Sequence, residues 1–135
     1  MRRPGWSASS HMTGDLMTAK TPDTEAVETV NAWLDAFNRD DMETVQSLFA
    51  PDGVVYVHGH ELHGWEEFIG WYEPWRDSLD AQVGFGYEYK EVLPGRGSAA
   101  AVIELWTDER RWTQIGVYHV QGGKVTELWG YEIEG

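Results

Sequence analysis

The chain has 135 residues, a formal net charge of −13 and no cysteine. The length fits one domain with a core of its own rather than two. The excess of negative charge argues against nucleic acids and anionic membranes as partners, because both bind clustered lysine and arginine. The lack of cysteine excludes disulfides, a thiolate nucleophile and cysteine-bound zinc. No apolar run has the length of a membrane span and no signal-peptide pattern is present, so we expect a cytoplasmic protein.

The first 21 residues predict a disordered leader. The stretch "MRRPGWSASSHMTGDLMTAKT" has no hydrophobic periodicity and is rich in Ser, Thr, Gly and Ala. Its "SSHM" is typical of a cloning remnant, so we expect part of the leader to derive from a vector. The single folded domain is expected over 22–135.

Helical patterns come next along the chain. Apolar residues at helical spacing predict a first helix that starts near residue 22 and ends near 37, and a short second helix over 42–49. A strand is expected over 54–58, followed by the loop "GHELHG". A third helix, over 65–79, carries a stripe of aromatic residues.

The remainder of the chain predicts β-structure. Four strands are expected over 81–93, 98–107, 111–120 and 124–134, joined by short turns that include "PGRG", "DER" and "GG". Strands joined by such turns form antiparallel hairpins. The order of elements predicts an α+β fold in which three N-terminal helices pack on one face of a curved antiparallel sheet.

Three stretches of the sequence resemble the NTF2-like superfamily. They are "AWLDAFNRDDMETVQSLFAPDGVVYVHG", "HGWEEFIGWYEPW" and "YHVQGGKVTELWGYEI", and the resemblance covers nearly all of residues 25–134. It implies the cone-shaped, cystatin-like fold shared by ketosteroid isomerase, scytalone dehydratase and the SnoaL-type polyketide cyclases. This fold serves enzymes, ligand binders and transport adaptors, so the fold alone does not settle the function.

The resemblance also indicates which residues lie around the concave pocket. The acid–base positions of ketosteroid isomerase correspond here to Trp33, Val57 and Gly116, and none of these can transfer a proton. The scytalone dehydratase tyrosine corresponds to Val57 and its aspartate to Asn38. The chemistry of those two enzymes is therefore not expected.

A different polar set follows if Gly116 faces the pocket. Alternation along the strand then places Trp112, Gln114 and Tyr118 on the same concave face. Hairpin pairing around the "DER" and "QGG" turns predicts that Glu104 lies opposite Gln114, and Gln114 opposite Glu132. The expected result is a row of two carboxylates that brackets an amide, with Trp106 beside it.

Two carboxylates in an aromatic-walled pocket suit acid–base catalysis. Desolvation would raise the pKa of one carboxyl so that it donates a proton, while the better hydrated one accepts. Two alternatives stay open. Glu104 is tied to Arg110 or Arg111, or faces solvent; or the faces are swapped, and His119 and Glu127 become the pocket candidates.

Histidines and aromatic residues supply further candidates. His58, His60 and His63 could hold a divalent metal, but we favour His58 as an acid–base group and expect no metal or cofactor. On the third helix, Trp71, Tyr72 and Trp75 are either core residues or the wall of the pocket.

These patterns predict a cofactor-independent enzyme of the SnoaL-like type. It would cyclise, isomerise, dehydrate or hydrolyse an apolar, polycyclic or polyketide-like substrate. The expected catalytic residues are Glu104, Glu132 and His58, and the expected substrate-binding residues are Trp33, Val57, Trp71, Tyr72, Trp75, Trp106, Trp112, Gln114 and Tyr118. The alternative is a non-catalytic module of the same fold that binds a small molecule or directs assembly. Because both faces of the sheet are apolar, we also expect a homodimer formed through the sheet.

Overall fold

The computed structural model describes residues 22–134, and the leader prediction for residues 1–21 lies outside them. Its elements in chain order are α1 Pro22–Asn38, α2 Met42–Ser47, β1 Phe49–Val57, β2 His60–His63, α3 Gly64–Asp80, β3 Gly86–Gly95, β4 Ser98–Trp106, β5 Arg111–Gln121 and β6 Lys124–Glu134. None of the helices in these residues is long and apolar enough to cross a membrane.

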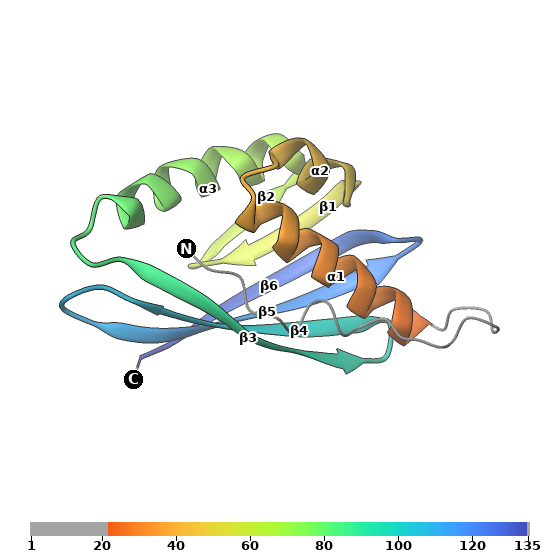
Figure 1. Ribbon diagram of the computed structural model, residues 1–135. Coiled ribbons are helices and arrows are strands. Elements are labelled where there is room, and N and C mark those ends of the chain that lie inside the picture. Colours follow the sequence, from red (N-terminus) through yellow and green to blue (C-terminus); the bar gives the residue numbers. More distant parts are fainter. Residues whose placement is uncertain (1–21, 135) are drawn as a thin grey trace.

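The six strands form one curved sheet in the order β2-β1-β6-β5-β4-β3. All neighbouring strands are antiparallel except β1 and β6, which are parallel. The helices lie on one face of the sheet, with α1 across β3 to β6 and α3 beside β1 and β2 (Figure 1). The predicted α+β class with three helices on a curved sheet is confirmed.

Trp33 connects the two long helices to the sheet. It lies on the apolar face of α1 with Ala26 and Val30, and all three are at most 2% exposed. Its ring lies 6.0 Å from that of Phe68 on α3 and 5.8 Å from that of Tyr118 on β5. Burial of so large an aromatic contributes a few kcal/mol, so this contact fixes the helices over the concave face.

A hairpin replaces the loop expected at "GHELHG". β1 and β2 are joined by His58 and Gly59, whose φ angles are 49° and 77°, and Val57 pairs with His60 across the turn. Two positive φ values are typical of the type I′ turn that joins antiparallel strands. The prediction missed β2 because three of its four residues are polar and two of them are histidine. The strand expected from residue 81 begins only at Gly86.

The predicted pairing of β4 with β5 is wrong by one residue. Ile103, not Glu104, lies opposite Gln114, and Glu104 lies opposite Thr113. The connection is one residue longer than assumed, because the Thr107 hydroxyl accepts hydrogen bonds from the backbone N–H groups of Glu109 and Arg110. A shift of one residue turns every side chain of a strand to the other face. The pairing of Gln114 with Glu132 is as predicted.

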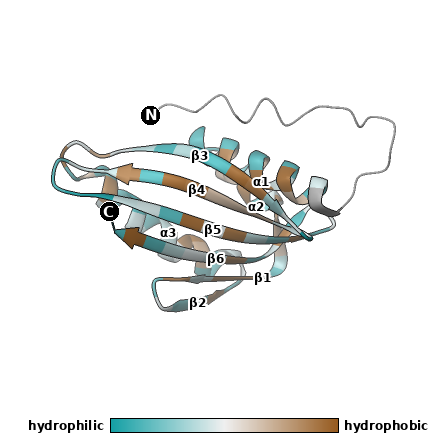
Figure 2. Ribbon diagram, turned by 90° about the horizontal axis from the view of Figure 1, so that it is seen from below, coloured by the Kyte–Doolittle hydropathy of each residue, from teal (hydrophilic) through white to brown (hydrophobic). Residues whose placement is uncertain are grey.

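The outer face of the sheet is partly apolar. Figure 2 views the sheet from the side opposite the helices and shows hydrophobic segments along β4, β5 and β6. Tyr131 and Ile133 of β6 are 51% and 52% exposed. On the same face, the ring of Trp129 stacks on that of Tyr56 with centroids 4.0 Å apart.

Candidate functional site

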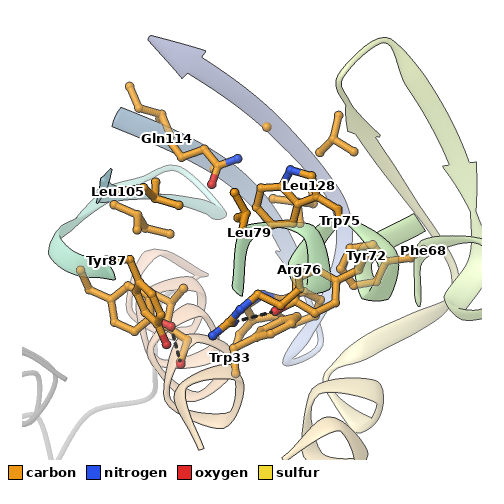
Figure 3. Close-up of a pocket in the computed structure, with 18 of the residues that line it drawn as sticks. Trp33, Phe68, Tyr72, Trp75, Arg76, Leu79, Tyr87, Leu105, Gln114 and Leu128 are labelled. Carbon is orange, nitrogen blue, oxygen red and sulfur yellow. Dashed lines mark hydrogen bonds between the residues drawn. The ribbon is translucent and has the colours of Figure 1, made fainter. Parts of the chain in front are cut away.

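An apolar cavity lies between the helices and the inner face of the sheet (Figure 3). Its volume is about 150 Å³, and α1, α3 and β3 to β6 all contribute side chains. An apolar cavity of about this size in another protein holds benzene, so the body of a one- or two-ring molecule suits it. Seven of the predicted substrate-binding residues line it, namely Trp33, Val57, Trp71, Tyr72, Trp75, Gln114 and Tyr118.

Two glycines form the floor of the cavity. Gly116 of β5 lies directly opposite Gly130 of β6. A Cβ atom at Gly116 would lie 3.0 Å from the Tyr118 ring, and one at Gly130 would lie 2.7 Å from Cγ1 of Val57. Side chains at these two positions would fill the space, so the hollow depends on the missing Cβ atoms.

Three tyrosine hydroxyls of the cavity wall are held in hydrogen bonds. Tyr87 donates to Oδ1 of Asn38 at 2.9 Å, and Tyr89 donates to the backbone oxygen of Leu34 at 3.2 Å. Tyr118 is hydrogen-bonded by Trp33. Burial raises the pKa of both Tyr89 and Tyr118, so these hydroxyls stay protonated at neutral pH.

A pair of ionisable groups, His58 and Glu132, lies next to residues that line the cavity, although neither of the two lines it. His58 Nε2 is 3.3 Å from a carboxylate oxygen of Glu132, and their side chains are 34% and 29% exposed. The cavity-lining rings of Trp71 and Trp75 lie 5.3 and 6.0 Å from the imidazole. Glu132 lies opposite Gln114 on the inner face. The polar row therefore reads His58, Glu132, Gln114, which is displaced by one strand from the predicted row.

His58 holds an unusual backbone conformation. Its φ of 49° lies in the left-handed region, which non-glycine residues rarely occupy. Asn or Gly is preferred at this position of a type I′ turn, and strain of this kind recurs at functional sites. The turn thus accepts a residue that it does not favour, and that residue reaches Glu132.

Three of the predicted site residues lie away from the cavity. Glu104 lies on the outer face, where Arg111 Nη1 is 3.0 Å and Lys90 Nζ 3.9 Å from its carboxylate. This is the ion-pair alternative considered for the sequence. Trp106 shares that face, with the Arg111 guanidinium 5.2 Å from its ring centroid. Trp112 points inward as predicted but is only 1% exposed, and Arg110 covers it.

The sequence analysis missed Arg76, which lines the cavity from α3. Its Nη1 donates to the Tyr72 hydroxyl at 3.2 Å, and its Nε donates to Asp80 at 3.1 Å. The signal was present in the sequence, since Tyr72, Arg76 and Asp80 follow one another at the i, i+4 spacing that places side chains on one helical face.

The three histidines of "HGHELH" do not converge. His58 pairs with Glu132, whereas His63 Nε2 lies 2.8 Å from Glu61. Within residues 22–134 no three His, Asp or Glu side chains are grouped so that they could hold a metal ion.

A deep, mostly apolar cavity in a cone of helices and curved sheet defines the NTF2-like class of folds. The SnoaL-like domain family matches residues 30–128, which is most of the chain. The protein therefore belongs to the SnoaL-like family. No curated protein matches the chain.

Solved structures show the same fold at low sequence identity. A protein of Sinorhizobium meliloti assigned as a polyketide cyclase is 19% identical, with a TM-score of 0.67 over 77% of this chain and 94% of the other. A protein of Kribbella flavida assigned as a ketosteroid isomerase is 17% identical, with a TM-score of 0.69 over 87% of this chain and 84% of the other. An epoxide hydrolase of M. tuberculosis is 22% identical, with a TM-score of 0.59 over 82% of this chain and 84% of the other. Likeness at this level extends to the fold and not to the reaction.

Proposed function

We propose that the protein is a small-molecule enzyme of the SnoaL-like type, in which His58 and Glu132 move a proton of a substrate held in the apolar cavity. The substrate has a flat aromatic or alicyclic body, because the cavity has aromatic walls and a glycine floor. A proton transfer of this kind is the common step of cyclisation, isomerisation, dehydration and epoxide hydrolysis. The observation that carries the proposal is the contact of 3.3 Å between His58 and Glu132.

His58 serves as the base and Glu132 stabilises its charged form. In this scheme Nε2–H of His58 is directed at the Glu132 carboxylate, 3.3 Å away, so that Nδ1 keeps its lone pair and serves as the base. When Nδ1 takes a proton, the carboxylate stabilises the resulting imidazolium. Gln114, beside Glu132 on the next strand, donates its amide N–H to a substrate oxygen and fixes the orientation of the substrate. Glu104 has no part in this scheme because it lies on the other face.

A probe that needs only a base in an apolar pocket tests the proposal without the natural substrate. The isoxazole ring of 5-nitrobenzisoxazole opens when a base removes the proton on its C3 atom and the N–O bond breaks, which gives a coloured cyanonitrophenolate. We expect the protein to accelerate this reaction over the buffer. We expect His58→Asn to lower the acceleration by roughly 100-fold, the usual worth of a positioned base.

The substitution His58→Asn separates chemistry from folding. Asn-Gly is a preferred type I′ turn sequence, so the variant should unfold at the same temperature as the parent or a higher one. The matched control is His60→Asn, two residues along on exposed β2, which should react at the parental rate. Equal rates for the parent and His58→Asn, or no acceleration by the parent, would contradict the proposal.

The alternative is a non-catalytic binding module of the same fold. One observation favours it: Glu132 also lies 3.8 Å from Arg110, so the carboxylate has the surroundings of a structural ion pair. In that case the cavity would bind apolar ligands, and the His58→Asn and parent proteins would both react no faster than the buffer.

We further propose that the outer face of the sheet forms a homodimer. The half-exposed Tyr131 and Ile133 and the stacked pair of Trp129 and Tyr56 supply the apolar surface. Tyr131→Glu should convert a dimer to a monomer in sedimentation. Val83→Glu, which changes an apolar residue 74% exposed in the loop before β3, should leave the dimer intact. A parent that sediments as a monomer would contradict this proposal.

A further inference from the structure

The walls of the cavity contain one charged group. Among the residues that line it, all of them within the described part of the chain, Arg76 alone carries a charge. Figure 3 shows Arg76 reaching into the cavity from α3, while Gln114 enters from the sheet on the opposite side. The cavity thus has a polar group on each side of an apolar body.

The Arg76 guanidinium is held in a fixed position. Nε donates to Asp80 at 3.1 Å and Nη1 donates to the Tyr72 hydroxyl at 3.2 Å. The guanidinium carbon lies 5.3 Å from the ring centroid of Tyr87 and 6.0 Å from that of Phe85. Contacts on its edge and on its face together restrain the plane of the group, so a ligand would meet it already oriented.

Two neighbouring donor groups, Nη2 of Arg76 and the hydroxyl of Tyr72, remain unused among the described residues. Within residues 22–134 no partner engages Nη2 of Arg76. The Tyr72 oxygen accepts from Arg76, which leaves its own hydrogen to donate. Burial raises the pKa of Tyr72, so the hydroxyl keeps that hydrogen at neutral pH. An arginine N–H beside a tyrosine O–H matches the two oxygens of a carboxylate.

Charges on the far side of Arg76 restrict how an anion reaches it. Arg76 also borders a second, polar cavity of about 490 Å³, which is lined by Asp40, Glu73, Asp77 and Asp80. These carboxylates repel an anion from that side. The ion pair with Asp80, whose side chain is 52% exposed, also partly neutralises the charge of Arg76. On the apolar side no lining residue is acidic. Water and salt weaken the repulsion at the exposed carboxylates more than the attraction at Arg76, which is only 27% exposed.

We infer that Arg76 and Tyr72 bind the carboxylate of an organic acid whose apolar body fills the cavity. This inference rests on the proposed function, because it names the substrate class of the same cavity. The carboxylate takes Nη2–H of Arg76 and O–H of Tyr72, and the rings of Trp33 and Trp75 cover the body. Arg76 is then a specificity-determining residue that acts on binding and takes no part in proton transfer.

Calorimetric titration with 2-naphthoate and 2-naphthamide at neutral pH tests this inference. The two probes share the apolar body and shape and differ in charge. We expect the parent to bind 2-naphthoate roughly tenfold more tightly than 2-naphthamide, the usual worth of a charge-assisted hydrogen bond less its desolvation. Arg76→Gln should remove the preference and leave the affinity for 2-naphthamide as it was. The control Arg39→Gln, an exposed arginine that forms ion pairs with Asp35 and Asp41, changes the net charge equally and should keep the preference.

A second variant covers the case in which Arg76→Gln fails to fold. Tyr72→Phe keeps the ring and removes one donor, so it should weaken 2-naphthoate severalfold and leave 2-naphthamide unchanged. Equal affinities of the parent for both probes, or tighter binding of 2-naphthamide, would overturn the carboxylate site while the apolar cavity stands. Binding of neither probe would overturn the cavity as a ligand site and the carboxylate site with it.

Discussion

The inner and outer faces of the sheet each carry a half-buried glutamate, and the two differ in what surrounds them. Glu132 and Glu104 have equally exposed side chains, 29% each. Glu104 lies between Arg111 and Lys90 on the solvent-facing side of the sheet. Glu132 contacts His58, which lies beside the cavity-lining rings of Trp71 and Trp75. Exposure and ion pairing therefore do not distinguish the two carboxylates; the face of the sheet does.

Among the comparisons between the two faces, the largest effect is expected when each of the two carboxylates is replaced in turn by an amide. Glu132→Gln removes the charge that stabilises the imidazolium of His58, so the opening of 5-nitrobenzisoxazole should slow by roughly tenfold or more. Glu104→Gln removes the same charge from the outer face and should leave the rate unchanged. A slower Glu104→Gln reaction would mean that the outer face takes part in the chemistry.

A second contrast lies within β5. Gly116→Val places a side chain on the inner face against the Tyr118 ring and should lower the affinity for 2-naphthamide by at least roughly tenfold, because it fills the floor. Thr113→Val introduces the same side chain on the outer face of the same strand, where affinity should not change. Calorimetry measures both. Parental affinity in Gly116→Val would show that the ligand does not rest on the glycine floor.

Alkaline pH should destabilise the protein because Tyr118 is buried on the inner face of the sheet. Burial raises the folded-state pKa of Tyr118 above its unfolded value of about 10. The buried, protonated tyrosine contributes its full stabilisation below the unfolded-state pKa. This contribution is lost as pH rises toward the folded-state pKa, at up to about 1.4 kcal/mol per pH unit for each such group. The free energy of unfolding should therefore fall less between about pH 9 and pH 11 in Tyr118→Phe, by about 1 kcal/mol. Tyr131→Phe, on the exposed outer face, should retain the parental pH dependence; an equal fall in all three proteins would contradict this assignment.

The smallest expected effect concerns the outer ion pair. Arg111→Gln leaves Lys90 as the cationic partner of Glu104, and the side chains of all three residues are partly exposed to water. Because exposed ion pairs contribute little, the free energy of unfolding should change by less than about 1 kcal/mol. Urea denaturation measures it, and a loss of several kcal/mol would mean that this pair holds the sheet together.

Much of the fold could be predicted from the sequence, because helical periodicity and short turns are local signals. The turn of Gly122 and Gly123 pairs Gln121 with Lys124, and a register shift between His119 and Val120 then brings Gln114 opposite Glu132, so the faces of β5 and β6 agree with the prediction. The face of β4 does not, because the side chain of Thr107 extends the turn to β5 by one residue. A hydroxyl that accepts backbone hydrogen bonds leaves no trace in a pattern of hydrophobic residues.

The contact between His58 and Glu132 was harder to predict than the cavity. Seven of the 21 residues that line the cavity were predicted, and three of the seven lie on α3, where aromatic residues at helical spacing mark one face. The contact of His58 with Glu132 depends on the parallel pairing of β1 with β6, which brings together residues far apart in the sequence. Local sequence patterns carry no signal for such a pairing. His58 and Glu132 were therefore predicted as site residues but not as a pair, and the predicted polar row contained Glu104 instead of His58.

A double-variant cycle tests most directly whether His58 and Glu132 act as one unit. Rates of 5-nitrobenzisoxazole opening would be measured for the parent, His58→Asn, Glu132→Gln and the variant with both changes. If the carboxylate acts through the imidazole, the double variant reacts as fast as His58→Asn alone, because Glu132 has nothing left to support. Losses that multiply in the double variant would show that the two residues act independently, and the central claim would be wrong.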